Sequence, residues 1–357
     1  MEEQTLTINK FGFNNFFKEA FSVYEDKDYQ IGRVALEHKR MYRVWTDNSE
    51  MLCEVSGKFS FSASSREDYP AVGDWVVIKE RAGEQRGTIH AVLPRKSKFS
   101  RKTAGMNTEE QIVAANVDTI FLVNSLNEDL NLRRLERYLL LSWESGANPV
   151  IVLTKADLCE NLEDQLADVD SVAMGVPVIS ISVIEEKGID QLKPFLEPGK
   201  TIALLGSSGV GKSTLTNYLL GEDKQKVQDI RISDDKGKHT TTHRELILLP
   251  DGAILIDTPG MRELQLWESE NGLSESFTDI EQAAENCRFR DCTHENEPGC
   301  AVHRLIEDGD ISGERLNSYK KLLKELAYLD RKQDKRAQSE ERKRWKKVSA
   351  GAKNKRM

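Results

Sequence analysis

The segment TIALLGSSGVGKSTLTNYLL, residues 201–220, decides the fold of the central part of this chain. A short apolar run is followed by a glycine-rich loop and then by a run suited to a helix. Strand, loop and helix in this order are the context in which the pattern GxxxxGK[ST] predicts a phosphate-binding loop. We therefore expect nucleotide binding by Gly206, Ser207, Ser208, Gly209, Val210, Gly211, Lys212, Ser213 and Thr214.

Two side chains of this loop have predicted catalytic roles. Lys212 is expected to reach the β and γ phosphates, and the Ser213 hydroxyl to bind Mg²⁺. The glycines allow backbone N–H groups to surround the phosphates, and the start of the following helix adds a favourable dipole.

The sequence around the loop alternates apolar runs with amphipathic stretches between residues 112 and 272. Such alternation predicts an α/β domain, in which a parallel sheet has helices on both faces. Ligands bind such sheets at the carboxyl ends of the strands, which is where the polar motifs of this region fall.

A second motif follows the phosphate loop. Asp257-Thr-Pro-Gly260 ends the apolar run AILID, and we expect Asp257 to hold Mg²⁺ indirectly and the Gly260 N–H to sense the γ phosphate. Between the two motifs lies GKHTTTH, residues 237–243, where Thr241 is the favoured Mg²⁺ ligand and Thr242 the alternative. An ordinary threonine-rich surface loop is the competing interpretation.

The base is expected to be read by a motif upstream, made of Thr154, Lys155, Ala156 and Asp157. The Asp157 carboxylate can accept both the N1 and N2 protons of guanine, and the Lys155 stem can cover the base. Thr154 stands where the usual motif has Asn. Ser182, after the next strand, is predicted to give a backbone contact to the guanine oxygen, although it could be a plain strand-end serine.

The order of these motifs indicates a circular permutation, because the guanine motif normally follows DTPG and here precedes the phosphate loop. A doubly wound sheet tolerates this, since all the loops of the site lie at one edge and moving the termini leaves them in place.

The regions on either side of the α/β domain have different sequence patterns. Residues 1–30 form an aromatic-rich arm, and residues 31–102 have the short alternating runs of a small all-β barrel. Barrels of this size often bind oligonucleotides. The basic residues that follow its last strand could contact nucleic acid or belong to a solvated linker: Arg95, Lys96, Lys98, Arg101 and Lys102.

Residues 273–330 read as helical around a cysteine cluster, Cys287-x4-Cys292-x-His294-x5-Cys300. Three thiolates and one imidazole complete a tetrahedral zinc site without an open position, so we expect a structural ion. His303 is a competing ligand. The total of five cysteines is odd, which argues against a disulfide framework.

Charge is unevenly distributed. The net charge is −8, but residues 331–357 hold twelve Lys/Arg against three Asp/Glu. This basic tail predicts a polyanionic partner, or else a solubilising terminus. With no long apolar run and no signal-like start, we expect a soluble, cytoplasmic protein that does not enter membranes.

Together, PAVGDWV, TKAD, GSSGVGKST, GKHTTTH, DTPGMRE and CRFRDCTHENEPGCAVH make the chain resemble the RsgA (YjeQ/YloQ) family of small-subunit-dependent GTPases from about residue 30 to 330. The resemblance implies an OB-fold barrel, a permuted GTPase domain that binds GTP and GDP with Mg²⁺, and a zinc domain. It also implies a protein that binds the 30S ribosomal subunit and its 16S rRNA late in maturation. We expect a monomer. GTP hydrolysis to GDP and phosphate, stimulated by the subunit, would time its release.

Hydrolysis poses a separate question, because Met261 stands where a Ras-like protein has the glutamine that orients water. We expect slow intrinsic hydrolysis, with the missing group supplied by His239, His243 or the ribosome. Two other functions compete: an RNA-binding module that nucleotide only stabilises, and an ATP-dependent P-loop enzyme.

Overall fold

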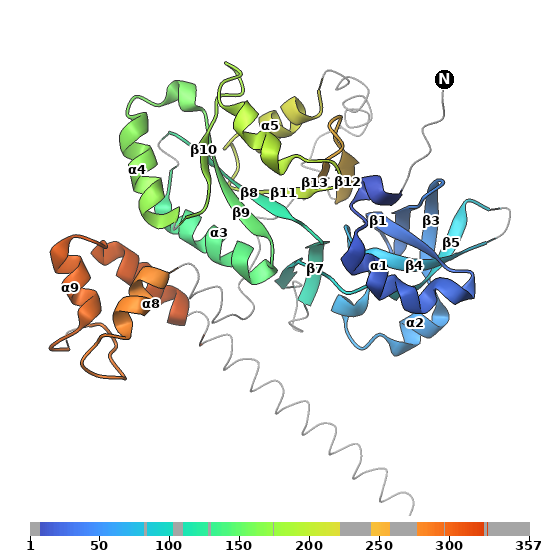
Figure 1. The fold of residues 1–357 in the computed structure, drawn as a ribbon, viewed down its shortest axis with the longest axis horizontal. Helices are drawn as coiled ribbons and strands as arrows, with labels where there is room; N and C mark the ends of the chain where they lie inside the picture. The colour runs from blue at the N-terminus through green and yellow to red at the C-terminus, as the bar shows by residue number, and fades with distance from the viewer. Residues whose placement is uncertain are drawn as a thin grey trace, which may run out of the picture. The chain divides into compact units, whose positions relative to one another are not determined.

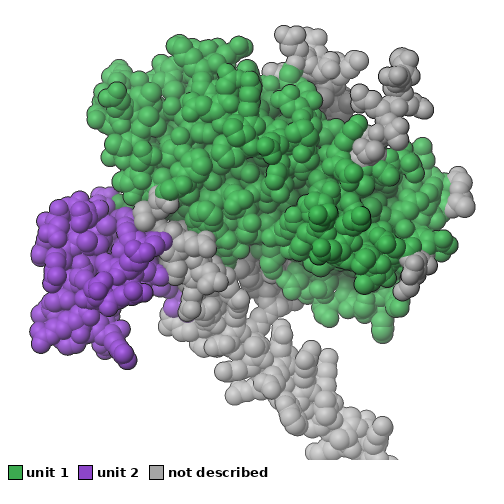
Figure 2. Space-filling model, in the orientation of Figure 1, with its two compact units in different colours: residues 1–265 green, residues 266–357 purple. Residues whose placement is uncertain are grey.

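The computed structural model describes residues 8–81, 84–102, 110–127, 130–173, 175–221, 244–257, 277–295, 297–324 and 327. The chain divides into two compact units, residues 1–265 and 266–357 (Figure 2). The predicted division into an arm (1–30), a barrel (31–102), a GTPase domain (112–272), a zinc domain (273–330) and a tail (331–357) stays a prediction.

The first part of unit 1 is a closed five-stranded barrel (Figure 1). Its strands are β1 (Gln30–His38), β2 (Met41–Trp45), β3 (Glu50–Val55), β4 (Trp75–Glu80) and β5 (Arg86–Val92). Their order is β1-β2-β3-β5-β4, and β4 pairs back with β1 to close the barrel. Only β3 and β5 are parallel. This confirms the predicted OB-type barrel.

Alternating apolar side chains explain the barrel core, because successive residues of a strand face opposite sides. Val34, Tyr42, Val44, Cys53 and Ile89 are among the buried residues that meet inside it. The connection from β3 to β4 contains two short helices, α2 (Gly57–Ser62) and η3 (Arg66–Asp68).

The aromatic arm covers one part of this barrel. Its elements are η1 (Ile8–Phe11), α1 (Asn15–Phe21) and η2 (Ser22–Lys27). Phe17 and Phe11 are buried. The ring of Phe17 lies 5.5 Å from that of Trp75, and the ring of Phe11 lies 4.8 Å from that of Trp45. The arm therefore extends the barrel core.

A separate two-stranded sheet follows, made of β6 (Lys98–Lys102) and β7 (Glu110–Ala115). The basic residue Arg95, just before β6, has a structural role. Its guanidinium donates to both carboxylate oxygens of buried Asp74, at 2.8 and 2.7 Å, and to the carbonyls of Glu67 and Tyr69. It fixes the β3–β4 connection to the barrel.

The second part of unit 1 is the predicted α/β sheet, and its strand order is β10-β9-β8-β11-β13-β12. Five strands are parallel, and β12 runs antiparallel to β13 at the edge. The bounds are β8 (Thr119–Ser125), β9 (Asn148–Thr154), β10 (Val178–Ser180), β11 (Thr201–Leu205), β12 (Glu245–Leu248) and β13 (Ile254–Asp257). The phosphate-loop strand β11 lies centrally, although three strands precede it in the chain.

Helices connect these strands. They are α3 (Leu132–Ser145), η4 (Ala156–Leu158), α4 (Leu162–Ala173), η5 (Ile189–Phe195) and α5 (Lys212–Leu219). Leu215 of α5 and Leu192 of η5 share a buried cluster with Phe121 and Val123 of β8. The α3 helix packs against β8 and β9, and its N-cap Asn131 accepts a hydrogen bond from the Arg134 N–H at 2.9 Å.

Barrel and α/β sheet are joined by strand pairing, by an ion pair between Arg43 of β2 and Glu245 of β12, and by a buried arginine. β12 pairs with β1 through Leu36 and Glu245, which makes one continuous sheet. Buried Arg33 of β1 donates to the Phe11 carbonyl at 2.5 Å and to the Thr201 hydroxyl of β11 at 2.8 Å. It also donates to the carbonyls of Gly73 and Asn116, both at 3.3 Å. One side chain thus ties the arm, the barrel and the phosphate-loop strand together.

Unit 2 contains α8 (Thr278–Ala284), α9 (Ala301–Asp308) and a helical run over residues 313–324. Phe277, Ile280, Val302 and Leu316 are buried between them. Within the residues that the structure describes, no helix has the length and apolar character needed to cross a bilayer.

Candidate nucleotide site and metal centre

The phosphate loop lies between β11 and α5, as the sequence predicts. Gly206 cannot carry a side chain, because a Cβ atom there would lie 2.2 Å from the Val123 carbonyl oxygen. Gly211 has a φ of +93°, a left-handed conformation that favours glycine. The loop thus approaches β8 closely and then turns its backbone into α5.

Lys212 begins α5 and folds its side chain back over the loop. Its ammonium group donates to the carbonyls of Gly206 at 2.8 Å and Ser207 at 2.5 Å. The next residue, Ser213, is exposed in the first turn of α5, where its hydroxyl could reach a metal ion. An ammonium group held within a loop of N–H donors at a helix start favours an anion such as a phosphate.

The guanine motif contacts the phosphate loop directly. Buried Thr154 ends β9, and its hydroxyl lies 2.6 Å from the Val210 carbonyl oxygen and 3.2 Å from that of Asn124. A hydroxyl has one proton to donate, and the shorter contact identifies Val210 as its main acceptor. Thr154 therefore joins the two predicted parts of the nucleotide site.

The remainder of this motif lies beside the segment that follows β10. Lys155 has a φ of 60°, and the Ala156 N–H donates to the Ile181 carbonyl at 3.1 Å. This places Asp157 near Ser182. The Ser182 N–H donates to the Lys187 carbonyl at 3.0 Å, so that N–H is already used within the protein.

The metal-binding side of the nucleotide site is only partly described. β13 ends at Asp257 and runs parallel to β11, with Ile256 beside Ala203. The backbone of Asp257 is thus at the same sheet edge as the phosphate loop. Thr241, Gly260 and Met261, and with them His239, Thr242 and His243, lie outside the described residues.

The cysteine cluster of unit 2 forms a compact set of donors. One ligand atom from each of Cys287, Cys292, His294 and Cys300 lies within 4.8 Å of all the others. Cys287 Sγ is 3.9 Å from Cys300 Sγ and 3.7 Å from His294 Nδ1. Zn–S bonds of about 2.3 Å put tetrahedral ligands about 3.8 Å apart, so these residues fit a zinc ion.

The competing ligand His303 has another role. Its Nε2 lies 3.1 Å from the His294 carbonyl oxygen, and it is not in the four-residue set. Burial raises the pKa of the Cys292 thiol to about 11. Burial also opposes ionisation of Cys287, but hydrogen bonds from the Ala301 and Val302 N–H groups and from the thiols of Cys292 and Cys300 together outweigh it and lower the pKa of that thiol.

Comparison with known proteins identifies the family. A family model described as RsgA GTPase matches residues 92–267. The chain is 46% identical over 341 residues to the small ribosomal subunit biogenesis GTPase RsgA 1 of Oceanobacillus iheyensis, with 94% of this chain and 97% of the relative covered. The chain belongs to the RsgA GTPase family. It is therefore a GTPase.

Other members of the family agree. The RsgA of Opitutus terrae is 44% identical over 355 residues, which cover 97% of each chain. The crystal structure of YjeQ from Thermotoga maritima matches with a TM-score of 0.62 at 27% identity, covering 84% of this chain and 99% of that one. A structure of YloQ, described as a circularly permuted GTPase, matches with a TM-score of 0.61 at 25% identity over 85% and 97% of the two chains.

These relatives confirm the predicted family, fold class and GTPase activity. A second model, described as ABC transporter, matches residues 189–355. This range includes the phosphate loop, a motif that many nucleotide-binding proteins share.

The positioning roles of two residues at the RsgA GTPase site were not predicted from the sequence. Thr154 is predicted as part of the base-reading motif, but the sequence does not predict the contact of its hydroxyl with the Val210 carbonyl. Arg33 carries no motif, and its contact with Thr201 spans 168 positions of the chain. A lone arginine in a strand otherwise rich in apolar residues was the only available signal.

Proposed function

We propose that this GTPase acts in the late maturation of the small ribosomal subunit. It binds the 30S subunit and its 16S rRNA as a cytoplasmic monomer, and GTP hydrolysis to GDP and phosphate times its release. The observation that supports this most strongly is the 46% identity, over nearly the whole of both chains, to a relative named for small ribosomal subunit biogenesis.

Residue roles within the nucleotide site belong to the same proposal. Residues 206–214 bind the phosphates, with Lys212 on the β and γ phosphates and Ser213 on Mg²⁺. Asp157 reads guanine, Lys155 covers the base and residues near Ser182 contact the guanine oxygen. The bond from Thr154 to Val210 supports this arrangement, because it holds the base loop against the phosphate loop.

Thr241 as Mg²⁺ ligand, Asp257 as its indirect ligand and Gly260 as γ-phosphate sensor complete the proposed site. Met261 cannot orient the attacking water, so intrinsic hydrolysis is slow and the subunit or a nearby histidine supplies the missing group. The ion in unit 2 is zinc, and its role is structural because four protein ligands leave no position for substrate.

GTP turnover with and without purified 30S subunits, in matched salt, tests the proposal. We expect slow turnover alone and a large increase with subunits. Lys212→Ala should retain subunit binding but lose turnover and timed release. No stimulation of the wild-type protein, or normal release of Lys212→Ala, would leave only an RNA-binding module and overturn the proposed cycle.

A further inference from the structure

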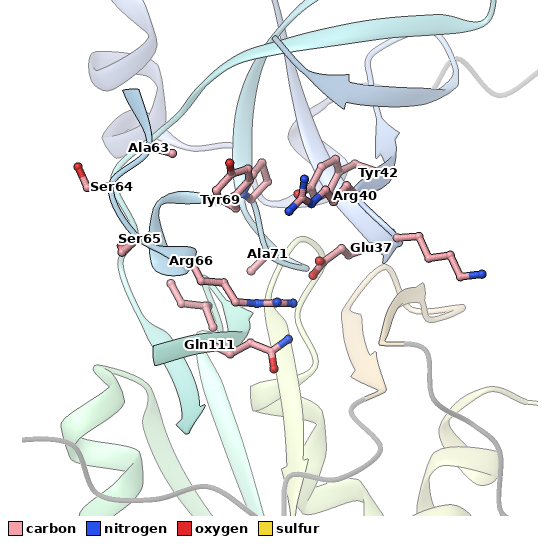
Figure 3. A pocket seen from close by; sticks show the side chains of 13 residues that line it. Glu37, Arg40, Tyr42, Ala63, Ser64, Ser65, Arg66, Tyr69, Ala71 and Gln111 are labelled. Carbon is pink, nitrogen blue, oxygen red and sulfur yellow. The ribbon is translucent and has the colours of Figure 1, made fainter. Parts of the chain in front are cut away.

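A hollow of about 440 Å³ opens on the barrel, and no residue of the phosphate loop lines it (Figure 3). Its size falls within the range of small-molecule pockets, roughly 300–1,000 Å³. Three segments line it: the β1–β2 hairpin, the connection from α2 to β4, and the start of β7. The sequence gives no motif for this site.

Two opposite charges face each other across the hollow. Figure 3 shows the Glu37 carboxylate and the Arg66 guanidinium turned toward one another. Arg66 is exposed, whereas Glu37 is half-buried. Among the residues that the structure describes, neither side chain has an ion pair or a side-chain hydrogen bond. A carboxylate and a guanidinium are thus both available to one ligand between them.

The remaining walls suit a flat ring. Buried Tyr42 and half-buried Tyr69 line the hollow, together with the apolar side chains of Pro70 and Ile112. The Tyr69 ring is held edge-on by Phe59 at 5.8 Å. Aromatic side chains of this kind stack on unpaired bases in RNA-binding proteins.

The wall that carries Arg66 and Tyr69 is built in advance. Arg95 donates to the carbonyls of Glu67 at 2.9 Å and Tyr69 at 3.0 Å, and is itself anchored on Asp74. On the other side of the short helix, the Asp68 carboxylate accepts the N–H groups of Ser64 at 2.7 Å and Ser65 at 2.9 Å. A preformed wall reduces the entropy lost on binding.

The mouth of the hollow is basic, although the chain has a net charge of −8. Lys39 and Arg40 form the two-residue turn of the β1–β2 hairpin and have left-handed φ values of 49° and 68°. Asn-Gly is preferred in such turns. Strained backbone of this kind is often retained at functional sites, and here it carries two exposed cations that line the hollow together with Arg66.

These features together select one base. Guanine offers two N–H donors, at N1 and N2, to a carboxylate, and two acceptors, O6 and N7, to a guanidinium. Adenine, cytosine and uracil each lack at least one of these pairs. We propose that this hollow binds one unpaired guanine nucleotide of an RNA strand, with the base against Tyr69 between Glu37 and Arg66, and its phosphates toward Lys39 and Arg40.

The inference that the hollow binds guanine does not depend on the GTPase site. The inference that this guanine belongs to an RNA strand rests on the proposed function. The test uses labelled five-nucleotide RNAs, oligouridine with a central G or a central A, and fluorescence anisotropy. The full-length protein is saturated with GDP and Mg²⁺, so that its GTPase site is filled. We expect the G-containing RNA to bind about tenfold more tightly, within the range for one bidentate base contact.

Glu37→Gln and Arg66→Gln should each abolish this preference while the protein stays folded by circular dichroism. Glu84→Gln and Arg86→Gln, exposed on the same barrel outside the hollow, are the matched controls and should keep the preference. Equal binding of the G and A oligonucleotides by the wild type, or a preference that survives in Glu37→Gln, would overturn the pocket.

Free GMP as competitor separates the two sources of guanine. If GMP displaces the G-containing RNA only at concentrations well above the Kd of the RNA, the ligand is RNA. If GMP binds as tightly as the RNA, RNA is not the ligand and the pocket binds a free nucleotide. Subunit-stimulated GTP turnover is measured alongside. If subunits stimulate turnover but the protein shows no preference for guanine, the pocket proposal is wrong and the proposed function is retained. If the protein prefers guanine but subunits do not stimulate turnover, the proposed function is wrong and the pocket proposal is retained.

Discussion

At the scale of single residues, Thr154 shows how one hydroxyl can join two functional loops. Its bond to the Val210 carbonyl fixes the distance between the proposed base and phosphate subsites. Thr154→Val keeps the shape but leaves a buried acceptor unpaired, which costs about 1–3 kcal/mol. We expect lower stability by that amount in urea and weaker binding of a fluorescent GDP analogue. Thr154→Ser, which keeps the hydroxyl, is the control; unchanged GDP affinity in Thr154→Val would contradict the argument.

Glu37 is a residue whose burial predicts a pH effect. Burial raises its pKa above the ordinary value of 4.5, and Arg66 and Arg244 only partly offset this. A raised carboxyl pKa contributes stability that is full below the unfolded pKa and is lost as pH rises through the folded pKa. Glu37→Gln has no such loss. The stability of Glu37→Gln relative to wild type, measured by urea unfolding, should therefore increase as the pH rises from about 4.5 through the folded pKa. A stability difference that does not change with pH would contradict this.

The turn residues Lys39 and Arg40 predict a conflict between stability and binding. Left-handed backbone in such residues costs about 1–3 kcal/mol each. The double substitution Lys39→Asn and Arg40→Gly supplies the preferred turn and should raise the free energy of unfolding by about 1 kcal/mol or more. The same change should weaken RNA binding in low salt, because two cations at the mouth are lost. A protein no more stable than wild type would show that the turn is unstrained.

At the scale of elements, we expect the metal ion to stabilise the loop of residues 287–300 more than the helices of unit 2. Residues 287–300 provide all four donors, while α8 is held to the helical run 313–324 by Arg315, which donates to Asp279 at 2.7 and 2.9 Å. Cys292→Ser should reduce bound zinc well below one ion per chain. It should also speed hydrogen exchange in the loop while the helices stay protected. Cys159→Ser is the control, and equal exchange in both variants would argue against a structural ion.

Elements set by local sequence were predictable, and those set by distant pairing were not. The path from β11 through the phosphate loop to α5 follows from a short motif, and alternation predicts the barrel strands. The pairing of Leu36 with Glu245 has no local signal, because either residue would suit many partners. Arg95 was predicted to face nucleic acid or solvent, but its guanidinium forms an ion pair with buried Asp74. The pocket between Glu37 and Arg66 likewise exists only once three segments have met.

At the scale of the whole molecule, the question is how the barrel and the GTPase sheet act together within unit 1. Arg33 is fully buried, and burial lowers its pKa to about 10, an effect that Asp118 and Asp74 oppose. It therefore stays charged near neutral pH. Its guanidinium also lies 5.4 Å from the Trp75 ring centroid, which adds a favourable contact. A buried cation with acceptors from the arm, the barrel and β11 makes their folding interdependent.

Two variants separate this joint from general stability. Arg33→Met removes the donor to the Phe11 and Asn116 carbonyls and to the Thr201 hydroxyl, and the loss of these hydrogen bonds should cost about 3–5 kcal/mol. Thr201→Val removes only the acceptor on β11 and should cost about 1–2 kcal/mol. We expect unit 1 of the wild type to unfold in urea in one cooperative transition and that of Arg33→Met to unfold in two. Hydrogen exchange should then show that peptides from β1 and β11 lose protection at different urea concentrations in the variant.

Thr201→Val also tests whether the joint carries a functional signal. Thr201 starts the strand that ends at the phosphate loop, but it does not belong to that loop, so GDP affinity and intrinsic turnover should stay at wild-type values. If the barrel reports subunit binding to the GTPase site through Arg33, stimulated turnover should fall severalfold in this variant. Full stimulation in a folded Thr201→Val protein would show that the signal passes elsewhere, for example through the pairing of β1 with β12 or through the ion pair between Arg43 of β2 and Glu245 of β12.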